Sequence, residues 1–410
     1  MSEATLVSVA IEEWKEAGQS QPPMTDRLAK VTLEALKRAK LSMRDIDVVI
    51  ATTSAIPFDN KEFITISAMH YANRVTEKLG SYGCQIINVS GACASAAQAF
   101  AIANAMIKSG VAKTALIIGV DNSPRGFYYQ GPSILDADLA VGYPHKVIGI
   151  TNPAYWAIWA VRRAYEDGIS IDEMKELMAL VKHYSSIYGA LNPYARYKKV
   201  FTPEDVLKSP VVCDPLHLYM ICAVSTGAGA AVVTEAEKAK MLTNKPIRVL
   251  ASKLGCPQYN EPAPRLVYFS TAGGSRASKP FTEWRQAVKS ALKEAAVTPD
   301  EIDILEVHDT SVFHTINWID QIMGWEYSET DKLIKKGEIK HNGILPTNLS
   351  GGTASFGEAV QCQAFMELHE LWLQLRGEAG PRQAKKKLRI GVATAYGAYG
   401  NYGTIVLEKA

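Results

Sequence analysis

Ala35-Leu36-Lys37-Arg38-Ala39, followed by Asp45-Ile46-Asp47-Val48-Val49, is the stretch on which the fold depends, because the chain repeats it. It returns as Ala291-Leu292-Lys293-Glu294-Ala295, followed by Glu301-Ile302-Asp303-Ile304-Leu305, at a constant offset of 256 residues. Each copy is typical of the end of a helix followed by a β-strand. Because such units are common, one echo alone does not establish a duplication.

A second echo follows in the same order. Asn88-Val89-Ser90-Gly91 pairs with Asn348-Leu349-Ser350-Gly351 at an offset of 260, and Gln98-Ala99-Phe100 pairs with Gln363-Ala364-Phe365 at an offset of 265. The growth of the offset indicates a loop insertion. Two echoes in one order predict a chain built from two related halves.

The composition is that of a globular protein. At 410 residues the chain exceeds a single ordinary core, which agrees with two halves. Hydrophobic residues make up 47% and charged residues 21% of the chain, which excludes a disordered or fibrous protein. The net charge of +2 argues against nucleic acid or an anionic membrane as the main partner. No apolar run approaches the roughly 18 residues needed to span a bilayer.

The cysteines point to a reducing compartment. Six of them, at positions 84, 93, 213, 222, 256 and 362, are scattered without paired spacing. This pattern indicates reduced thiols in a cytoplasmic protein. Cys213, His217 and Cys222 lack the close pairs of a zinc site, so no metal is expected. All cysteines except Cys93 are interpreted as small buried residues.

Short β-branched runs alternate with helical stretches, which predicts an α/β fold with crossover connections. The expected strands are residues 6–10, 48–52, 85–89, 114–120, 247–251, 304–307, 388–394 and 404–407. The expected helices are residues 25–39, 66–78, 95–108, 281–295, 311–323 and 359–375. The middle is rich in aromatic, proline and basic residues and then turns small and glycine-rich. We therefore expect an N-terminal half (1–121), an inserted loop or cap domain (122–243) and a C-terminal half (244–410).

Cys93 is the candidate nucleophile. It follows an Asn-x-Ser-Gly turn and opens a predicted helix, where unpaired N–H groups and the helix dipole stabilise a thiolate. The offset of 265 residues pairs Cys93 with Glu358, which follows the equivalent turn. Pseudo-twofold packing of the halves would bring these two helix starts face to face. The small neighbours of Cys93 leave room for a bulky acyl substrate.

His308 is the third candidate. It lies at the end of a predicted strand, in Glu306-Val307-His308-Asp309-Thr310. Catalytic groups in α/β sheets gather at the carboxyl ends of strands. An imidazole there can polarise a thioester carbonyl or transfer a proton near neutral pH. We expect Cys93, His308 and Glu358 to share one cleft.

Two further groups allow alternative interpretations. One is a basic triplet, which either contacts the phosphates of an anionic cofactor or forms a solvated face; it consists of Arg196, Lys198 and Lys199. The other is a set of aromatic residues, compatible with an aromatic or polycyclic substrate but equally with core packing; these are Trp156, Trp159, Tyr184 and Tyr188.

The motifs resemble those of the thiolase superfamily, in particular its sterol-carrier-protein-type (SCP2-like) thiolase and acetyl-CoA acetyltransferase branch. Val307-His308-Asp309-Thr310 is similar to the His-Asp motif of that branch, and Gly91-Ala92-Cys93-Ala94-Ser95 is similar to its nucleophile motif. The segments Ser350 to Glu358 and Gln374 to Gly380 resemble its C-terminal signature. The resemblance covers nearly the whole chain. It implies a thiolase fold, with duplicated halves packed as a five-layered α-β-α-β-α sandwich, and a dimer.

The resemblance also implies roles for the candidate residues. Cys93 would carry the acyl group, and His308 would hold the thioester oxygen. The backbone N–H groups of Cys93 and Gly400 would form a second oxyanion hole. Two departures stand out: Glu358 replaces the usual histidine base, and Tyr396 or Gly397 falls where common thiolases carry a second cysteine. Glu358 can serve as the base if burial raises its proton affinity.

The resulting hypothesis is a β-ketoacyl-CoA thiolase, a type of enzyme used in β-oxidation, which cleaves a 3-oxoacyl-CoA with coenzyme A through an acyl-cysteine. Coenzyme A would be a cosubstrate, with no permanently bound cofactor. The alternatives are a retro-aldolase or acyltransferase on the same scaffold, or a non-catalytic acyl-CoA-binding subunit of a complex. Relatives in this branch imply a small accessory subunit with a zinc ribbon and an oligonucleotide-binding fold.

Overall fold

The computed structural model describes residues 2–19, 21–53, 71–80, 82–123, 151–255, 282–397 and 401–410. Its strands are β1 (Ala4–Ile11), β2 (Lys15–Glu16), β3 (Val48–Thr53), β4 (Gln85–Val89), β5 (Thr114–Asn122), β6 (Val211–Cys213), β7 (Leu216–His217), β8 (Ser225–Glu235), β9 (Ile247–Gly255), β10 (Ile304–Glu306), β11 (Ile390–Gly397) and β12 (Asn401–Lys409). Its α-helices are α1 (Met24–Ala39), α3 (Tyr71–Leu79), α4 (Ser95–Lys108), α7 (Asn152–Asp167), α8 (Ile171–Leu191), α9 (Pro203–Lys208), α10 (Ala236–Leu242), α11 (Thr282–Ala295), α12 (Val312–Met323), α13 (Tyr327–Lys335), α14 (Gly352–Phe356) and α15 (Gln363–Arg376). The strands and helices expected from the periodicity are all present where the chain is described; the start of the helix expected over 66–78 and the first residue of that over 281–295 lie outside.

The strands form two half-sheets that meet edge to edge. The order is β10-β11-β12-β9-β1-β8-β5-β3-β4, and the two halves join where β1 pairs antiparallel with β9. In the N-terminal half, β3 lies parallel between β4 and β5. In the C-terminal half, β10 runs parallel to β11. Parallel strands joined through helices are the crossover units that the alternating pattern predicted.

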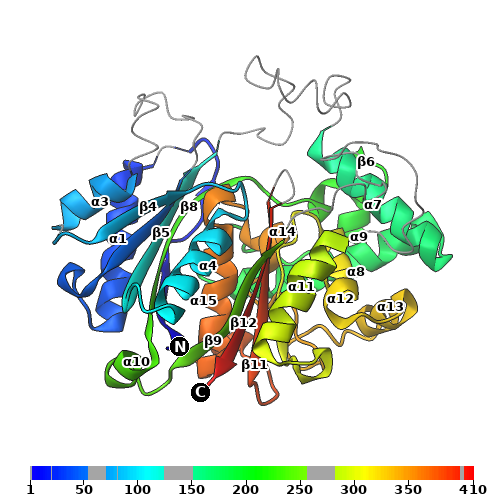
Figure 1. The fold of residues 1–410 in the computed structure, drawn as a ribbon. Coiled ribbons are helices and arrows are strands. Elements are labelled where there is room, and N and C mark those ends of the chain that lie inside the picture. Colours follow the sequence, from blue (N-terminus) through cyan, green and yellow to red (C-terminus); the bar gives the residue numbers. More distant parts are fainter. Residues whose placement is uncertain are drawn as a thin grey trace, which may run out of the picture.

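Five layers are visible in Figure 1. Helices α1 and α3 cover the outer face of the N-terminal half-sheet, and α11 and α12 cover the outer side of the C-terminal one. Helices α4 and α15 lie between the two half-sheets, where α4 contacts β5 and β9 and α15 contacts β1 and β11. This arrangement confirms the expected five-layered α-β-α-β-α fold.

The duplication extends to individual backbone angles. Helix α1, a short 3-10 turn and β3 are matched by α11, a second 3-10 turn and β10. Lys40 and Ala296, which are 256 positions apart, both adopt the left-handed conformation, with φ of 55° and 51°. Ala92 and Gly352, which are 260 positions apart, do the same at φ of 52° and 58°. The two halves therefore repeat their turns as well as their elements.

The expected extent of the insert needs a correction. Residues 225–235 fall in the segment predicted as the insert, but they form β8, which pairs with both β1 and β5 in the main sheet. Glycines hid this strand: Cβ atoms at Gly227 and Gly229 would lie 2.5 Å from the Trp14 and Phe365 side chains, so large residues cannot fit there. The division into three segments otherwise stays a prediction.

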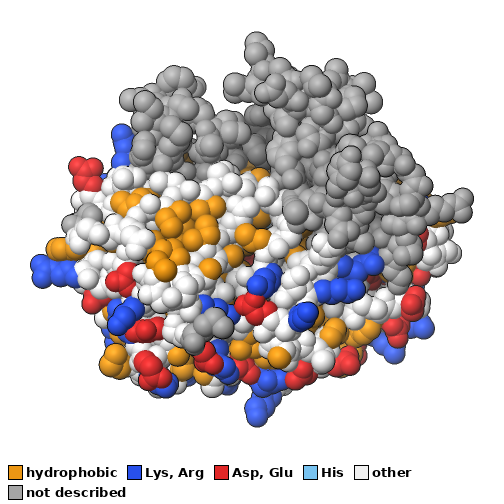
Figure 2. Space-filling model, in the orientation of Figure 1, with side chains coloured by type: hydrophobic (Ala, Val, Ile, Leu, Met, Phe, Trp, Pro, Cys, Tyr) orange, Lys and Arg blue, Asp and Glu red, His pale blue; other side chains and the backbone are white. Residues whose placement is uncertain are grey.

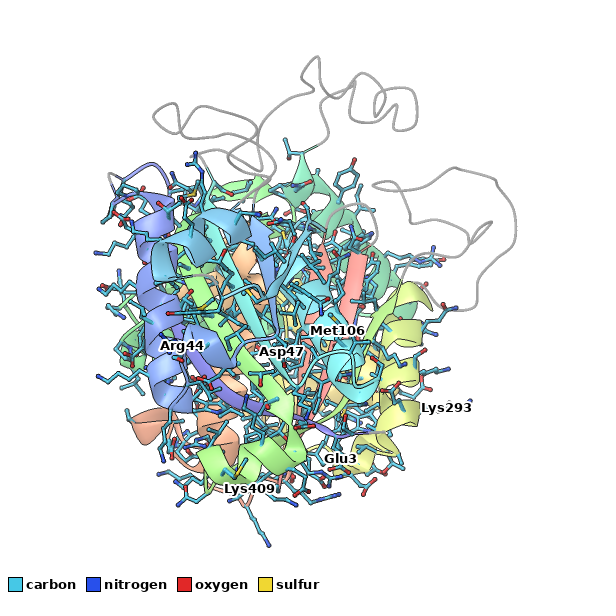
Figure 3. All side chains as sticks on the ribbon, turned by 60° about the vertical axis from the view of Figure 1, so that its left-hand side comes forward. Glu3, Arg44, Asp47, Met106, Lys293 and Lys409 are labelled. Carbon is cyan, nitrogen blue, oxygen red and sulfur yellow. The ribbon has the colours of Figure 1, made fainter. Side chains whose placement is uncertain are left out.

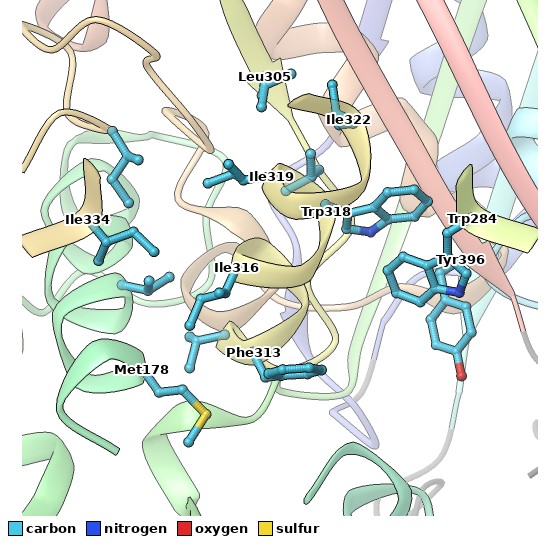
Figure 4. Packing of buried hydrophobic residues seen from close by; sticks show 14 of the residues in the cluster. Met178, Trp284, Leu305, Phe313, Ile316, Trp318, Ile319, Ile322, Ile334 and Tyr396 are labelled. Atoms are coloured by element: carbon cyan, nitrogen blue, oxygen red, sulfur yellow. The ribbon is translucent and has the colours of Figure 1, made fainter. Parts of the chain in front are cut away.

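The core is continuous from the C-terminal half-sheet into the inserted segment. Figure 4 shows α12 presenting Phe313, Ile316 and Ile319 towards Met178 of α8, with Trp318 on its other side beside Trp284. Burial of these large apolar side chains is the main driving force for this packing.

The outer surface shows where charge and apolar side chains gather. On the face in Figure 2, charged side chains concentrate along the lower part, and apolar ones gather over the region of β4 and α4. Figure 3 shows Glu3 and Lys409 near the lower end of the strands. There Arg248 of β9 pairs with Glu3, which directly precedes β1, and with Glu408 of β12. No helix among the described residues is long and apolar enough to cross a membrane.

Candidate active site

A strained turn presents Cys93 between β4 and α4. Ala92 has φ of 52°, a conformation that non-glycine residues rarely adopt. The Ser95 hydroxyl holds the turn: it accepts from the Gly91 N–H (2.8 Å) and donates to Gln361 Oε1 (2.5 Å). Gly397, at the end of β11, packs so closely that a Cβ there would lie 2.4 Å from the Gly91 carbonyl oxygen. The loop that carries Cys93 is thus held by contacts from both halves.

His308 follows β10 and points at Glu358. The Tyr396 backbone N–H donates to Nδ1 of the ring at 3.0 Å. This bond leaves the ring proton on Nε2, which lies 3.0 Å from Glu358 Oε1 and donates to it. The carbonyl of His308 accepts from the Trp318 indole at 3.0 Å, so ring and backbone are both held.

Glu358 is set by a glycine and a short strand-like pairing. Gly357 before it has φ of 111°, and a Cβ there would lie 2.3 Å from the Ser225 hydroxyl. The Glu358 N–H donates to Ala223 (2.9 Å), and its carbonyl accepts from Ser225 (2.7 Å). Glu358 does not open α15 as expected, because a 3-10 turn at Val360–Cys362 intervenes.

The structure brings the three candidates together. The buried Cys93 thiol is an electrostatic neighbour of the Glu358 carboxylate, which accepts a hydrogen bond from His308. Glu358 Oε2 is buried and lacks a donor at normal hydrogen-bond geometry within the described ranges. The carboxylate therefore keeps one oxygen able to receive a proton.

The electrostatics of the pair differ from the sequence-based expectation. Burial raises the pKa of the Cys93 thiol well above its usual value, and the neighbouring Glu358 charge adds to this. The predicted thiolate stabilisation by the helix terminus is therefore outweighed. Burial alone would also raise the pKa of Glu358, but the neighbouring His308, and to a smaller extent Cys93 and Cys222, lower it overall. The resting pair is a neutral thiol beside an ionised carboxylate.

Cys222 lies beside the three candidates, which the sequence analysis did not expect. The Cys222 side chain helps to lower the pKa of Glu358, and its backbone N–H donates to the Thr310 carbonyl at 2.9 Å. It was interpreted as a structural cysteine because nothing in its local spacing links it to residue 358. Only the pairing of Val224 with Glu358 and of Ile221 with Ser311 brings it to the site.

The three residues of the basic triplet lie in different environments, one at a cavity and two on the exposed surface. Arg196 donates to the Val224 carbonyl (2.8 Å), lies 3.6 Å from Glu16, and lines a cavity of about 260 Å³. Lys198 donates to the Asn192 carbonyl, and Lys199 lies 5.1 Å from the Phe201 ring. Lys198 and Lys199 are both exposed.

The aromatic candidates pack with other rings. Trp156 and Trp159 each contact the buried His314 ring edge-on, with centroids 5.7 Å apart. Tyr188 hydrogen-bonds His341 at 3.0 Å, and Tyr184 is 5.5 Å from the Lys340 ammonium. These contacts agree with the core-packing interpretation.

The remaining expectations concern metals and the second oxyanion hole. No group of three metal-ligating side chains occurs in the part of the chain that the structure describes. Gly400 and Cys256 lie outside the described residues.

Two protein families match parts of the chain. Residues 272–409 match the family described as "Thiolase C-terminal domain-like". Residues 87–134, which include Cys93, match "3-Oxoacyl-[acyl-carrier-protein (ACP)] synthase III".

Individual proteins extend the similarity. An acetyl-CoA acetyltransferase from Methanocaldococcus jannaschii is 25% identical and covers 93% of this chain and 92% of its own. Human sterol carrier protein 2 is also 25% identical, over 75% of this chain and 56% of its own. The solved structure "Ltp2-ChsH2(DUF35) aldolase" has a TM-score of 0.79 at 20% identity, covering 99% of this chain and 98% of that one. The chain therefore has a thiolase fold, and its resemblance to the thiolase superfamily is confirmed.

Proposed function

We propose that the protein is a β-ketoacyl-CoA thiolase that cleaves a 3-oxoacyl-CoA with coenzyme A. The observation that carries the proposal is the convergence of the Cys93 thiol and the His308 Nε2–H on one buried carboxylate, Glu358. A nucleophile, a proton acceptor and a hydrogen-bond donor are the groups that acyl transfer through a covalent intermediate requires.

The first half-reaction transfers the acyl group to Cys93. Its sulfur attacks the keto carbon as Glu358 takes the thiol proton, and the bond between the α- and β-carbons breaks. Once protonated, Glu358 is a weaker acceptor, which frees the His308 Nε2–H to stabilise the enolate oxygen of the departing acetyl-CoA. Glu358 then returns the proton to the enolate carbon.

The second half-reaction regenerates the enzyme. The thiol of coenzyme A attacks the acyl-cysteine and gives its proton to Glu358, which returns it to the departing Cys93 sulfur. The weak basicity of Glu358 means that proton transfer and attack must coincide, because little free thiolate exists beforehand. Of the basic triplet, the exposed Lys198 and Lys199 are the proposed contacts for the phosphates of coenzyme A, with Arg196 facing the cavity behind.

Mass spectrometry tests the covalent step. The protein is incubated with an acyl-CoA and digested, and the peptide containing Cys93 is weighed. We expect an acyl adduct on Cys93 that free coenzyme A removes, and neither adduct nor turnover in Cys93→Ala. Full activity in Cys93→Ala would refute the proposal, and binding without any adduct would favour the non-catalytic subunit.

A second candidate is a retro-aldolase, and the ionised Glu358 is the observation that favours it. A carboxylate with a lowered pKa beside a thiol with a raised pKa activates that thiol weakly, whereas it can accept the proton of a substrate hydroxyl. His308 would then stabilise the thioester enolate. Cleavage that persists without free coenzyme A and in Cys93→Ala would select this reaction.

The proposed assembly is a homodimer that works with a small accessory subunit. The similar solved structure is titled as an aldolase of two named components, which supports a partner of this kind. Activity is therefore to be assayed both alone and with any small protein that co-purifies.

A further inference from the structure

We propose that Gln361 is a positioning residue of the active centre, whose side chain connects the loop of Cys93 to the turn that follows Glu358 and so keeps the two functional groups in their relative place. This inference deepens the proposed function and rests on it for the roles of Cys93 and Glu358. The connection runs from one half of the duplicated chain to the other.

The backbone of Gln361 is held by two strands of the N-terminal half. Gln361 lies in the 3-10 turn between Glu358 and α15. Its N–H donates to Asp121 Oδ2 near the end of β5 at 3.2 Å, and its carbonyl accepts from the Thr52 hydroxyl of β3 at 2.8 Å. Gly119 of β5 leaves room for that hydroxyl, since a Cβ there would lie 2.4 Å from it. The turn is therefore anchored on the opposite half-sheet.

The side chain of Gln361 reaches the start of α4. Its Oε1 lies 2.5 Å from the Ser95 hydroxyl, which also accepts from the Gly91 N–H at 2.8 Å and lies 2.6 Å from the Ala92 carbonyl oxygen. Ala92 is the residue with positive φ directly before Cys93, so the hydroxyl holds the strained part of the loop. Gln361 and Ser95 are both buried, and loss of one partner would leave the other less satisfied at a cost in free energy.

One hydrogen bond thus joins the two loops that carry the functional groups. Cys93 precedes Ser95 by two residues, and Glu358 precedes Gln361 by three. A displacement of reacting groups by about 1 Å can slow a reaction by about a hundredfold. A contact that fixes the two loops relative to each other therefore acts on the chemical step.

A double-mutant cycle on the alkylation of Cys93 tests this contact without requiring turnover. Wild type, Ser95→Ala, Gln361→Met and the double variant are treated with iodoacetamide at pH 8, and the Cys93 peptide is followed by mass spectrometry. We expect each single variant to react about three- to tenfold faster, because the buried thiol is exposed more often once its loop is released. The double variant should match Ser95→Ala within about twofold, because Gln361 then has no hydroxyl to bind.

Two further variants serve as controls. Gln361→Glu keeps an acceptor oxygen at the same reach, so it should react no faster than wild type. Gln363→Met makes the same substitution two residues further on, where the amide donates instead to Glu367 at 3.0 Å. Its alkylation rate should stay within about twofold of wild type, because this amide does not hold the loop of Cys93.

A second readout uses the acyl-transfer reaction and separates positioning from substrate binding. Gln361→Met should lower kcat by about tenfold or more and leave KM within about twofold, because the misplaced groups still bind substrate but react slowly. A higher KM with unchanged kcat would overturn the positioning role.

The outcomes also separate this proposal from the proposed function. Unchanged alkylation in Gln361→Met, faster alkylation in Gln361→Glu, or a double variant whose acceleration is the product of the two single effects would each overturn the role of Gln361. Absence of acyl transfer in wild type would refute the thiolase while leaving the alkylation cycle to decide on Gln361. If Gln361→Met does not fold, Ser95→Ala removes the same hydrogen bond, and an unchanged alkylation rate in that variant overturns the proposal alone.

Discussion

At the scale of single residues, the surroundings of Cys93 keep its thiol protonated at rest. Cys93 is buried, and the adjacent Glu358 charge disfavours a second anion. A cysteine at a helix start ordinarily gains thiolate character from the dipole. Here burial and the adjacent carboxylate outweigh that gain. In the proposed mechanism Glu358 therefore has two opposed effects: it suppresses the free thiolate, and it would accept the thiol proton during attack.

Glu358→Gln separates these two effects. Removing the negative charge should lower the pKa of Cys93 by about one to two units and speed its alkylation at pH 7 by about ten- to hundredfold. The same variant should lose acyl transfer by about a hundredfold or more, because the amide cannot accept the proton. Alkylation rates and steady-state kinetics measure the two effects independently.

Two observations would contradict this account. Slower alkylation in Glu358→Gln would mean that the carboxylate promotes thiolate formation at rest. Unchanged acyl transfer would mean that another group accepts the proton. Cys93→Ala serves as the control that the label reports on this thiol.

At the scale of elements, tight turns hold the site together. The loop of Cys93 depends on the left-handed Ala92, and the loop of Glu358 depends on Gly357, whose φ is 111°. A side chain at residue 357 would meet both strain and the Ser225 hydroxyl. These turns fix the path of the two loops, and hence where the candidate side chains Cys93 and Glu358 lie.

Gly357→Ala should therefore destabilise the protein by about 2–4 kcal/mol and displace Glu358. Gly377→Ala is the matched control, because Gly377 also has positive φ, 72°, but nothing lies within 4 Å of its Cβ position. It should cost about 1 kcal/mol for the backbone conformation alone. Denaturant unfolding measures both free energies, and equal losses would show that the contact with Ser225 carries no weight.

The sequence predicts a helix or strand well where the residues of that element alone carry its hydrophobic pattern. The strand Gln85–Val89 and the helix Ser95–Lys108 were expected at their observed bounds, because alternation, small residues and periodicity mark them directly. β8 was missed because its small residues serve close packing with Trp14 and Phe365. The internal sequence repeat predicted that Cys93 and Glu358 lie close together. Cys222 comes near them because its neighbours Ile221 and Val224 pair with Ser311 and Glu358, and such long-range pairing leaves no local pattern.

At the scale of the whole molecule, duplication creates a layer that is shielded on both sides. Helix α15 lies between the half-sheets, and nearly all of its residues are buried. Glu367 of this helix accepts from Gln363 at 3.0 Å, while its Oε2 has no donor within the described residues. Burial raises the pKa of Glu367 well above its usual value, and the charges of Glu306 and Asp309 add to this.

The buried Glu367 carboxyl should lower the stability of the folded protein as pH rises. The folded state keeps the Glu367 proton where the unfolded chain releases it, so its contribution to stability is present below about pH 4 and falls as pH rises. Glu367→Gln cannot release a proton and should gain on wild type by about 1.4 kcal/mol per pH unit above about pH 5, until the folded pKa is reached. Urea unfolding between pH 5 and 8 measures this difference. The exposed Glu237→Gln reports the effect of surface charge alone. A constant difference between Glu367→Gln and wild type across this range would show that Glu367 is ionised in the folded protein, and that water reaches the middle layer.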